Sequence, residues 1–435
     1  MHLPGRPGCT VVGSPCPEVG WPTDLPAGSV YVAVGGTGAG TAHEPVGTIA
    51  EALALVADGG TIALGVGTFD GPVQLARPVT VRGSCAQGTV LTATLTPDAM
   101  LLDIDADTTL RDLTLRPVGG MGAPLDGATL VLDQVVVDGF VERAFWLQEA
   151  TLLADGLLCL DGEAFTPEGD YGRCISAGDG RVQVFRSAFR GMEGLSVFAL
   201  GETDVDLEDV AVQGRGTVDT VAAVRVIQGD LSARRIWVGS PGQRGIMATE
   251  GTFQLEHVVV TGAREYDNGL PFLGEGAGIA AQASTGSIDQ AWVYGNAIGI
   301  ITFSAEGVEP YRVEVRDTFV ETAVAPESLV PGGLVDSRSE LHAERVRVTG
   351  PGRAFVGAGE SRLVDVLLAS RPQGPDDNPD REVASIVGEV LMERVEIELG
   401  EVDRGLMLGV GAFGTPSRVL RDVRIHGIDV GVGLE

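Results

Sequence analysis

The chain has 435 residues and a formal net charge of −30, from 60 acidic and 30 basic residues, and every basic residue is arginine. A surface this acidic repels phosphate backbones and anionic lipids, which argues against nucleic-acid partners and membrane-surface roles. No run of about 18 apolar residues is present, so we expect no membrane insertion.

Residues 1–30 are rich in proline and glycine and show no periodicity, which predicts an irregular lead-in before one folded region over 31–435. The beginning of the chain lacks the apolar core of a signal peptide. Either a signal has been removed, or the chain is a segment of something longer.

The five cysteines form no C-x-x-C pair. Cys9 and Cys16 could close a small loop in the lead-in, while Cys159 and Cys174 flank a loop insertion and could staple it. Disulfides would imply an oxidising compartment, so we expect an extracellular or cell-surface protein.

Regular structure begins near Tyr31. The segment 47–58 carries Ile49, Ala52 and Val56 at helical spacing and is followed by two glycines, which predicts a short helix. Strands follow from about residue 61 to the C-terminus.

A phrase close to L-x-D-V-x-V-x-G recurs about every 26 residues, a period typical of solenoids. Clear copies are 132–139, 207–214, 255–262 and 420–427. Within each copy the apolar residues at positions four and six point inward, position five points outward and position eight turns the corner. A second, looser strand follows in many coils, as at 144–147. These features predict an all-β parallel β-helix of about 13 coils, because a propeller would need longer repeats and short hairpin turns.

The segment 31–83 carries the features that connect this prediction with a known family. Val32-Ala-Val-Gly-Gly, the helix at 47–58, the strand at 61–69 and Val79-Thr-Val-Arg-Gly83 resemble the start of right-handed parallel β-helix proteins of the pectin lyase-like superfamily. The resemblance implies that the helix caps the N-terminal end of the solenoid. It covers nearly the whole chain but implies no single activity, because the superfamily includes lyases, hydrolases, adhesins and silent surface proteins.

The third position of the phrase alternates in charge from residue 317 onward. Stacked strands lie about 4.8 Å apart, so opposite charges there predict an outer ion-pair ladder, with a charged binding stripe as the alternative. The residues in this column are Arg186, Asp209, Arg235, His257, Gln290, Asp317, Arg345, Asp365, Arg394 and Asp422.

Insertions fall at one phase of the repeat, at 118–128, 163–170, 263–278, 323–333 and 371–382. Such insertions emerge from one edge of a solenoid, which is often the binding face. We therefore place candidate ligand-binding residues there, namely Glu168, Asp170, Tyr266, Asp267, Asn268 and Glu275. Tolerated loop decoration explains the insertions equally well.

One insertion has the D-x-N-x-D spacing that can surround Ca²⁺ with oxygens, through Asp376, Asn378 and Asp380. It lacks the glycine and glutamate of an EF-hand, and a solvated acidic loop is the alternative. We name these residues as the candidate metal site, with Ca²⁺ as its ion.

Sequence motifs do not identify an enzyme. A polysaccharide lyase on this fold needs an arginine or lysine base beside a calcium site, and the strand acids here interleave with arginine instead of clustering. Hydrolase motifs are missing, and no catalytic residue is assigned. We expect a non-catalytic scaffold, adhesion or carbohydrate-binding module. A lyase or glycoside hydrolase working at the loop-bearing edge is the alternative, with polysaccharide or a surface glycan as partner.

A stalk segment that stacks end to end is the third hypothesis. The last coil carries no capping helix in the sequence, and an uncapped coil is an exposed sheet edge that invites pairing. Truncation or a continuing partner domain at this end would fit the same observation.

Overall fold

A computed structural model describes residues 11–18, 20–22, 24–164, 172–215, 222–264, 276–304, 311–323, 332–351, 353–370, 382–398, 404–408, 418–426 and 432–434. Strands make up 62% of the structure and helix 2%. The chain divides into two compact units, Met1–Arg215 and Gly216–Glu435. The structure contains no helix, among these residues, that is long and apolar enough to cross a membrane.

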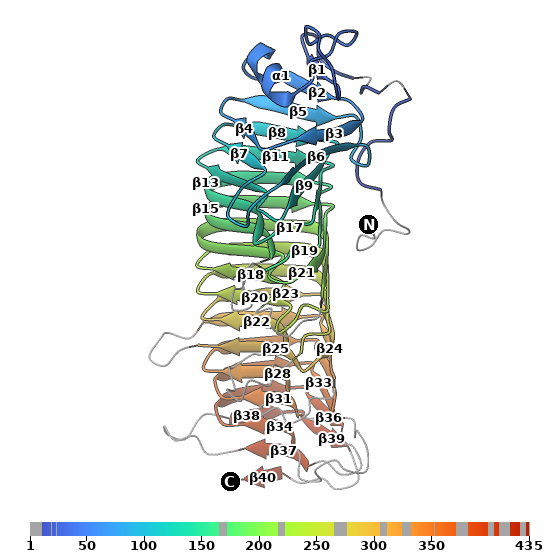
Figure 1. Cartoon of the computed structure of the whole chain (residues 1–435). Helices are drawn as coiled ribbons and strands as arrows, with labels where there is room; N and C mark the ends of the chain where they lie inside the picture. Colours follow the sequence, from blue (N-terminus) through green and yellow to red (C-terminus); the bar gives the residue numbers. More distant parts are fainter. Residues whose placement is uncertain are drawn as a thin grey trace. The chain divides into compact units, whose positions relative to one another are not determined.

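The first unit is built from three stacks of parallel strands (Figure 1). Its first stack holds β4 (Val73–Leu75), β7 (Leu102–Ile104), β10 (Ala123–Asp126) and the leading parts of β13 (Arg143–Asp155), β15 (Arg173–Phe185) and β17 (Val197–Gly214). Its second stack holds β1 (Val30–Val32), β2 (Thr61–Leu64), β5 (Val79–Gly83), β8 (Thr108–Arg111), β11 (Thr129–Asp133) and further parts of β13, β15 and β17. Its third stack holds β3 (Gly67–Asp70), β6 (Thr89–Thr94), β9 (Thr114–Val118), β12 (Val136–Asp138), β14 (Leu158–Leu160), β16 (Ala188–Met192) and the end of β17.

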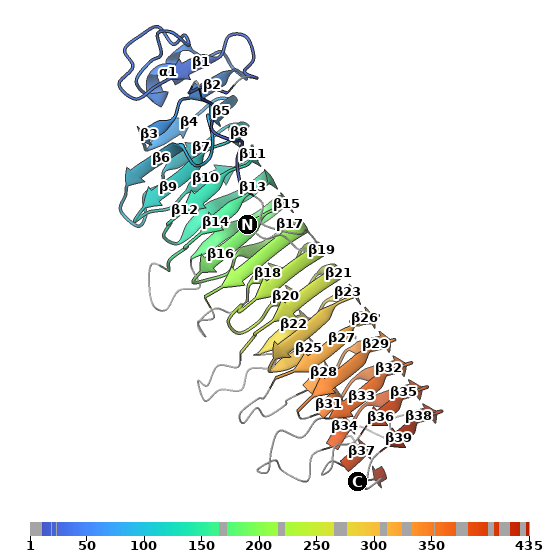
Figure 2. The same cartoon turned by 90° about the vertical axis from the view of Figure 1, so that its right-hand side faces the viewer.

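The second unit repeats this arrangement, and Figure 2 shows its second stack strand by strand. The first stack holds β18 (Val224–Ile227), β20 (Ile246–Thr249), β22 (Ala277–Gln282), β25 (Ile298–Phe303), β28 (Gly332–Ser337), β31 (Arg353–Gly357), β34 (Glu382–Ile386), β37 (Arg404–Leu408) and β40 (Val432–Leu434). The second stack holds parts of β19 (Asp230–Gly239) and β21 (Thr252–Thr261), then β23 (Thr285–Asp289), β26 (Arg312–Arg316), β29 (Glu340–Glu344), β32 (Glu360–Val364), β35 (Glu389–Glu393) and β38 (Arg418–Arg421). The third stack holds the ends of β19 and β21, then β24 (Trp292–Asn296), β27 (Phe319–Thr322), β30 (Arg347–Gly350), β33 (Leu367–Ser370), β36 (Glu396–Glu398) and β39 (Arg424–His426).

This pairing confirms the expected all-β parallel β-helix. The number of turns is about 11, slightly below the number of coils that counting copies of the phrase predicts. The core follows the predicted pattern. Leu132, Val135 and Val137 are fully buried, whereas Val136 lies partly exposed between them. Stacked coils thus bury aliphatic columns in each unit.

Position three of the phrase differs from the expectation. It is a corner between the second and third stacks, which lies between two strands in most coils and within the continuous strands β17, β19 and β21 at Asp209, Arg235 and His257. All ten residues predicted to form the ladder adopt positive φ there, for example 54° at Gln290. The corner amide then donates a hydrogen bond to the next coil, as from Gln290 N to the carbonyl of Arg316, at 3.1 Å. Left-handed backbone at this point lets the chain turn sharply between two stacks.

The predicted helix is confirmed as α1 (Ile49–Leu55), shorter than the expected segment. Thr48 caps its N-terminus and forms a capping box with Glu51. Ile49 and Ala52 are buried, and the helix lies beside β1 and β2 at the N-terminal end of the first unit (Figure 1).

The disulfides confirm one expected pair and correct the other. Cys159 is bonded to Cys174, as predicted. Cys16 is bonded to Cys85, not to Cys9, which lies outside the described residues. The winding of the coils places the turn after β5 against the lead-in, and spacing along the chain does not reveal such a pairing.

Candidate functional site

A charged groove lies on the outer face of the second stack in the second unit. It has a volume of about 390 Å³ and crosses β26, β29, β32 and β35. A shallower groove of about 210 Å³ adjoins it and shares His342 and Arg362 with it. We call the two together the second-stack groove. The residues lining its larger part are Arg312, Glu314, Arg316, His342, Ala343, Glu344, Arg362, Val364, Glu393 and Arg394.

Strand alternation places these side chains outward. In β26 the two valines are buried, and the residues on either side of them face solvent. The register then sets Glu314 beside His342, and His342 beside Arg362 in the next coil. Adjacent strands lie about 4.8 Å apart, so acidic and basic groups from successive coils come within contact distance.

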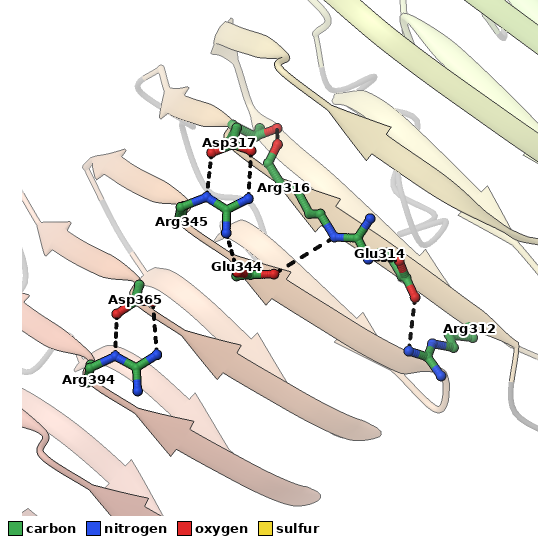
Figure 3. Close-up of polar contacts among 9 residues, drawn as sticks. Arg312, Glu314, Arg316, Asp317, Glu344, Arg345, Asp365 and Arg394 are labelled. Carbon is green, nitrogen blue, oxygen red and sulfur yellow. Dashed lines mark hydrogen bonds and ion pairs between the residues drawn. The ribbon is translucent and has the colours of Figure 1, made fainter.

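Ion pairs connect the charged side chains of β26 and β29 at one end of the groove (Figure 3). Arg312 Nη2 lies 2.9 Å from a carboxylate oxygen of Glu314, and Arg316 contacts both Glu314 and Glu344. These side chains are partly exposed, so each pair contributes little to stability, about 0–1 kcal/mol. Their main effect is to hold the guanidinium groups in fixed positions.

His342 is the titratable group at the centre of the groove. Its Nε2 atom lies 2.9 Å from Glu340 Oε1. Burial and the guanidinium of Arg312 lower the pKa of His342, and Arg362 lowers it further, against the opposing effect of Glu340. The imidazole is therefore neutral near pH 7. A neutral ring whose Nε2 faces a carboxylate carries its proton there, which leaves a lone pair on Nδ1.

Arg362 differs from the other arginines of the groove. Within the part of the chain that the structure describes, no carboxylate forms an ion pair with its guanidinium. Its side chain is exposed and lines both parts of the groove. It therefore presents unpaired hydrogen-bond donors beside a neutral imidazole.

Sequence reasoning did not find this groove. The alternation of charged and apolar residues in β26 and β29 is visible in the sequence, but it reads as the solvated face of a strand. The signal that could have found it is a histidine at the same outward position as Glu314 and Arg362 in neighbouring coils.

The residues proposed from sequence as ligands lie outside the described residues, so these predictions stay open. They are Glu168, Asp170, Tyr266, Asp267, Asn268, Glu275, Asp376, Asn378 and Asp380. Three of the insertions are flanked by a strand of a third stack and a strand of a first stack, namely β14 and β15, β21 and β22, and β27 and β28. Among the described residues no cluster of three or more His, Cys, Asp or Glu side chains could hold a metal ion. The Ca²⁺ prediction rests on the undescribed loop alone.

No family model matches the chain, and no curated protein matches its sequence. Among solved structures it is similar to the A-module of a mannuronan C-5 epimerase from Azotobacter vinelandii, at 14% identity over 86% of this chain and 89% of that one, with a TM-score of 0.35. It is similar to the catalytic unit of a GH87 α-1,3-glucanase from Streptomyces thermodiastaticus, at 14% identity over 93% and 70%, with a TM-score of 0.36. A GH87 α-1,3-glucanase catalytic domain in complex with nigerose matches at 12% identity over 94% and 69%, with a TM-score of 0.44. These likenesses concern the fold alone.

Proposed function

We propose that this protein binds polysaccharide in the second-stack groove, as an extracellular or cell-surface β-helix module. The observation that carries the proposal is the guanidinium of Arg362, which forms no ion pair with any carboxylate among the described residues, beside the neutral imidazole of His342. A guanidinium offers five N–H donors in a planar fork, which matches a carboxylate or two neighbouring hydroxyl groups of a sugar.

The form of the groove supports a chain-like ligand. It crosses successive coils and adjoins the shallower groove that reaches Leu391 and Val419. Its walls combine fixed charges with a short apolar stretch, so one sugar could meet hydrogen-bond donors while its neighbour covers aliphatic surface. Such sites place a few polar groups among apolar ones.

Binding measurements with an Arg362→Ala variant test the proposal. We expect the wild-type protein to retain a soluble polysaccharide in affinity electrophoresis or calorimetry, and the variant to lose at least about tenfold in affinity, which corresponds to about 1.4 kcal/mol. The panel should hold neutral glucans and uronic-acid polymers, because the guanidinium accommodates both and the net charge of −30 opposes the second.

Arg77→Ala is the matched control. It removes the same charge from a partly exposed position in the first unit, where Arg77 pairs with Asp58. It should bind like the wild type. Equal affinities of the wild type and Arg362→Ala for every polymer bound would contradict the assignment of the site.

A polysaccharide lyase is the second candidate function, and His342 is the observation that favours it. Nδ1 of the neutral ring could accept the proton from the carbon next to a uronate carboxylate, while Arg362 stabilises the charge that develops on that carboxylate. The electron pair of the broken C–H bond then forms a C=C bond as the glycosidic C–O bond on the adjacent carbon breaks, and the departing sugar oxygen takes a proton from water. Formation of unsaturated product, followed by ultraviolet absorbance, tests this, with His342→Ala as the inactive variant. Binding of the polymer without formation of product would support the non-catalytic binding module and contradict the lyase. The stalk hypothesis stays a prediction.

A further inference from the structure

Three aromatic side chains lie together on the outer face of the third stack in the second unit. Trp292 and Tyr294 come from β24, and Phe319 comes from β27. The ring centroids of Trp292 and Tyr294 are 4.8 Å apart, and those of Trp292 and Phe319 are 6.4 Å apart. Half of the Trp292 surface, 50%, is exposed. We call these three residues the aromatic platform.

Strand geometry explains why the rings face solvent together. Val293 and Val320 point into the core and are fully buried, so their neighbours on each strand point outward. The register sets Trp292 directly beside Phe319 in the next coil. The platform is therefore as rigid as the stack that carries it.

Polar groups border the platform. Glu321 is the register partner of Tyr294, and the guanidinium carbon of Arg347 lies 5.9 Å from the centre of the Phe319 ring. Ring faces edged by a carboxylate and a guanidinium combine stacking surface with hydrogen-bonding groups.

Core packing does not account for these rings. The valines of the same strands already fill the interior, and aromatic residues make up only 5% of the chain. Exposing an aromatic surface to water forgoes the free energy gained when it is buried. A grouped and exposed arrangement is typical of a contact surface.

We propose that the aromatic platform is a saccharide-stacking site, separate from the second-stack groove and resting on the proposed polysaccharide function. The C–H groups on one face of a pyranose ring carry partial positive charge and pack against the negative face of an aromatic ring. The platform spans two strands, about 4.8 Å apart, which suits two adjacent sugars of an extended glycan. Glu321 and Arg347 would bind the hydroxyl groups at the edges of those sugars.

The size of the platform favours a glycan over a protein partner. A fully exposed aromatic side chain offers roughly 150–250 Å², and here each ring is partly covered. Three such rings fall well below the ~800 Å² per partner that a stable protein interface buries. A short stretch of sugar needs far less contact area.

The test uses the full chain and the polysaccharide that the binding panel identifies. Trp292→Ala should weaken binding about tenfold, while Trp292→Phe should retain most of the affinity because it keeps a ring. Trp146→Ala is the matched control, since Trp146 lies in the first unit and is 44% exposed. It should bind like the wild type. Thermal unfolding of each variant checks that the fold is intact.

The outcomes separate this inference from the proposed function. If Arg362→Ala loses affinity and Trp292→Ala keeps it, the platform is not a saccharide site, although the groove is. If no polysaccharide binds the wild type, both proposals fail. If Trp292→Ala instead abolishes self-association in analytical ultracentrifugation without changing glycan affinity, the platform joins copies of the chain and the saccharide assignment is overturned.

Discussion

Arg345 reaches from its own coil to Asp317 in the preceding coil and binds both oxygens of that carboxylate. The Nε–Oδ1 and Nη2–Oδ2 distances are 2.7 and 2.8 Å. Both residues are corners with positive φ, 53° and 48°. The same geometry recurs between Arg394 and Asp365, at 2.6 and 2.9 Å. Figure 3 shows the two pairs, which occupy alternate steps of the corner column in the second unit.

The corner position explains why charge alternates there. Left-handed backbone turns the side chains of neighbouring corners outward in line, so each arginine meets the aspartate of the coil before it. Two bidentate contacts also orient the guanidinium, because its planar fork matches a carboxylate. The ladder is thus present at these two steps, although it runs along corners and not along strands.

The corner should tolerate flexible or short polar residues and reject β-branched ones. Gln290 has a φ of 54°, and its backbone amide is hydrogen-bonded to the next coil. Gln290→Val should destabilise the protein by about 1–2 kcal/mol, because left-handed backbone brings Cβ too close to the carbonyl oxygen. Gln290→Gly should remain near the wild type. Urea unfolding measures both, and equal midpoints for the two variants would contradict the strain argument.

The sequence predicted the core better than the corner, for a physical reason. Val135 and Val137 occupy positions of the phrase that are apolar in successive copies, and both are buried. Apolar residues at this regular spacing predict the buried face of a strand. The corners are occupied by Asp, Arg, His or Gln, which share no property that predicts positive φ. Glycine is the residue type that would have indicated it.

Sequence reasoning failed elsewhere because the information is three-dimensional. The bond between Cys16 and Cys85 spans 69 residues, and only the winding of the coils brings the two together. The second-stack groove depends on register between coils, which places His342 beside Arg362. Neither relationship appears in the spacing of residues along the chain.

Burial of Asp336 makes the contribution of this one residue to stability fall with rising pH. Its carboxylate is fully buried and accepts hydrogen bonds from the hydroxyls of Ser339, Ser361 and Thr302. Burial raises the pKa of Asp336 from 3.8 to about 6, despite these hydrogen bonds. The folded state therefore binds the proton more tightly than the unfolded state, so this stabilisation is complete below pH 3.8 and lost as the pH rises through about 6.

Asp336→Asn should remove this dependence. The amide keeps the shape of the acid without a charge, so we expect the variant to be more stable than the wild type at pH 7–8, by at most roughly 3 kcal/mol. The two proteins should converge near pH 4. Asp103→Asn, at an exposed position in β7, serves as the control. Chemical unfolding across this pH range measures the difference, and parallel pH profiles would rule out a buried, ionised Asp336 as the cause.

The disulfide between Cys16 and Cys85 should stabilise the first unit by fixing the lead-in. The backbone amides of Gly13 and Ser14 donate to the corner side chains Gln134 and Asp112, at 2.9 and 2.7 Å. Cys85→Ser should lower stability by about 2–5 kcal/mol, because the bond closes a long loop in the unfolded chain.

Limited proteolysis locates the effect of that change. Cleavage of Cys85→Ser should begin within residues 11–24, where the lead-in loses its covalent anchor. Cys9→Ser leaves the Cys16–Cys85 bond intact and should behave like the wild type. If both serine variants unfold at the same temperature as the wild type, the lead-in contributes nothing to stability.

The pKa of His342 should report on each charged neighbour separately. Burial lowers it first, Arg312 and Arg362 lower it further, and Glu340 raises it. Arg362→Ala should therefore raise the pKa, and Glu340→Gln should lower it, while Arg77→Ala in the first unit should leave it unchanged. Titration of the imidazole by NMR measures all three. A pKa that moves equally in Arg362→Ala and Arg77→Ala would mean that only net charge acts, whereas opposite shifts in Arg362→Ala and Glu340→Gln would show that His342 interacts with a cation and with a carboxylate.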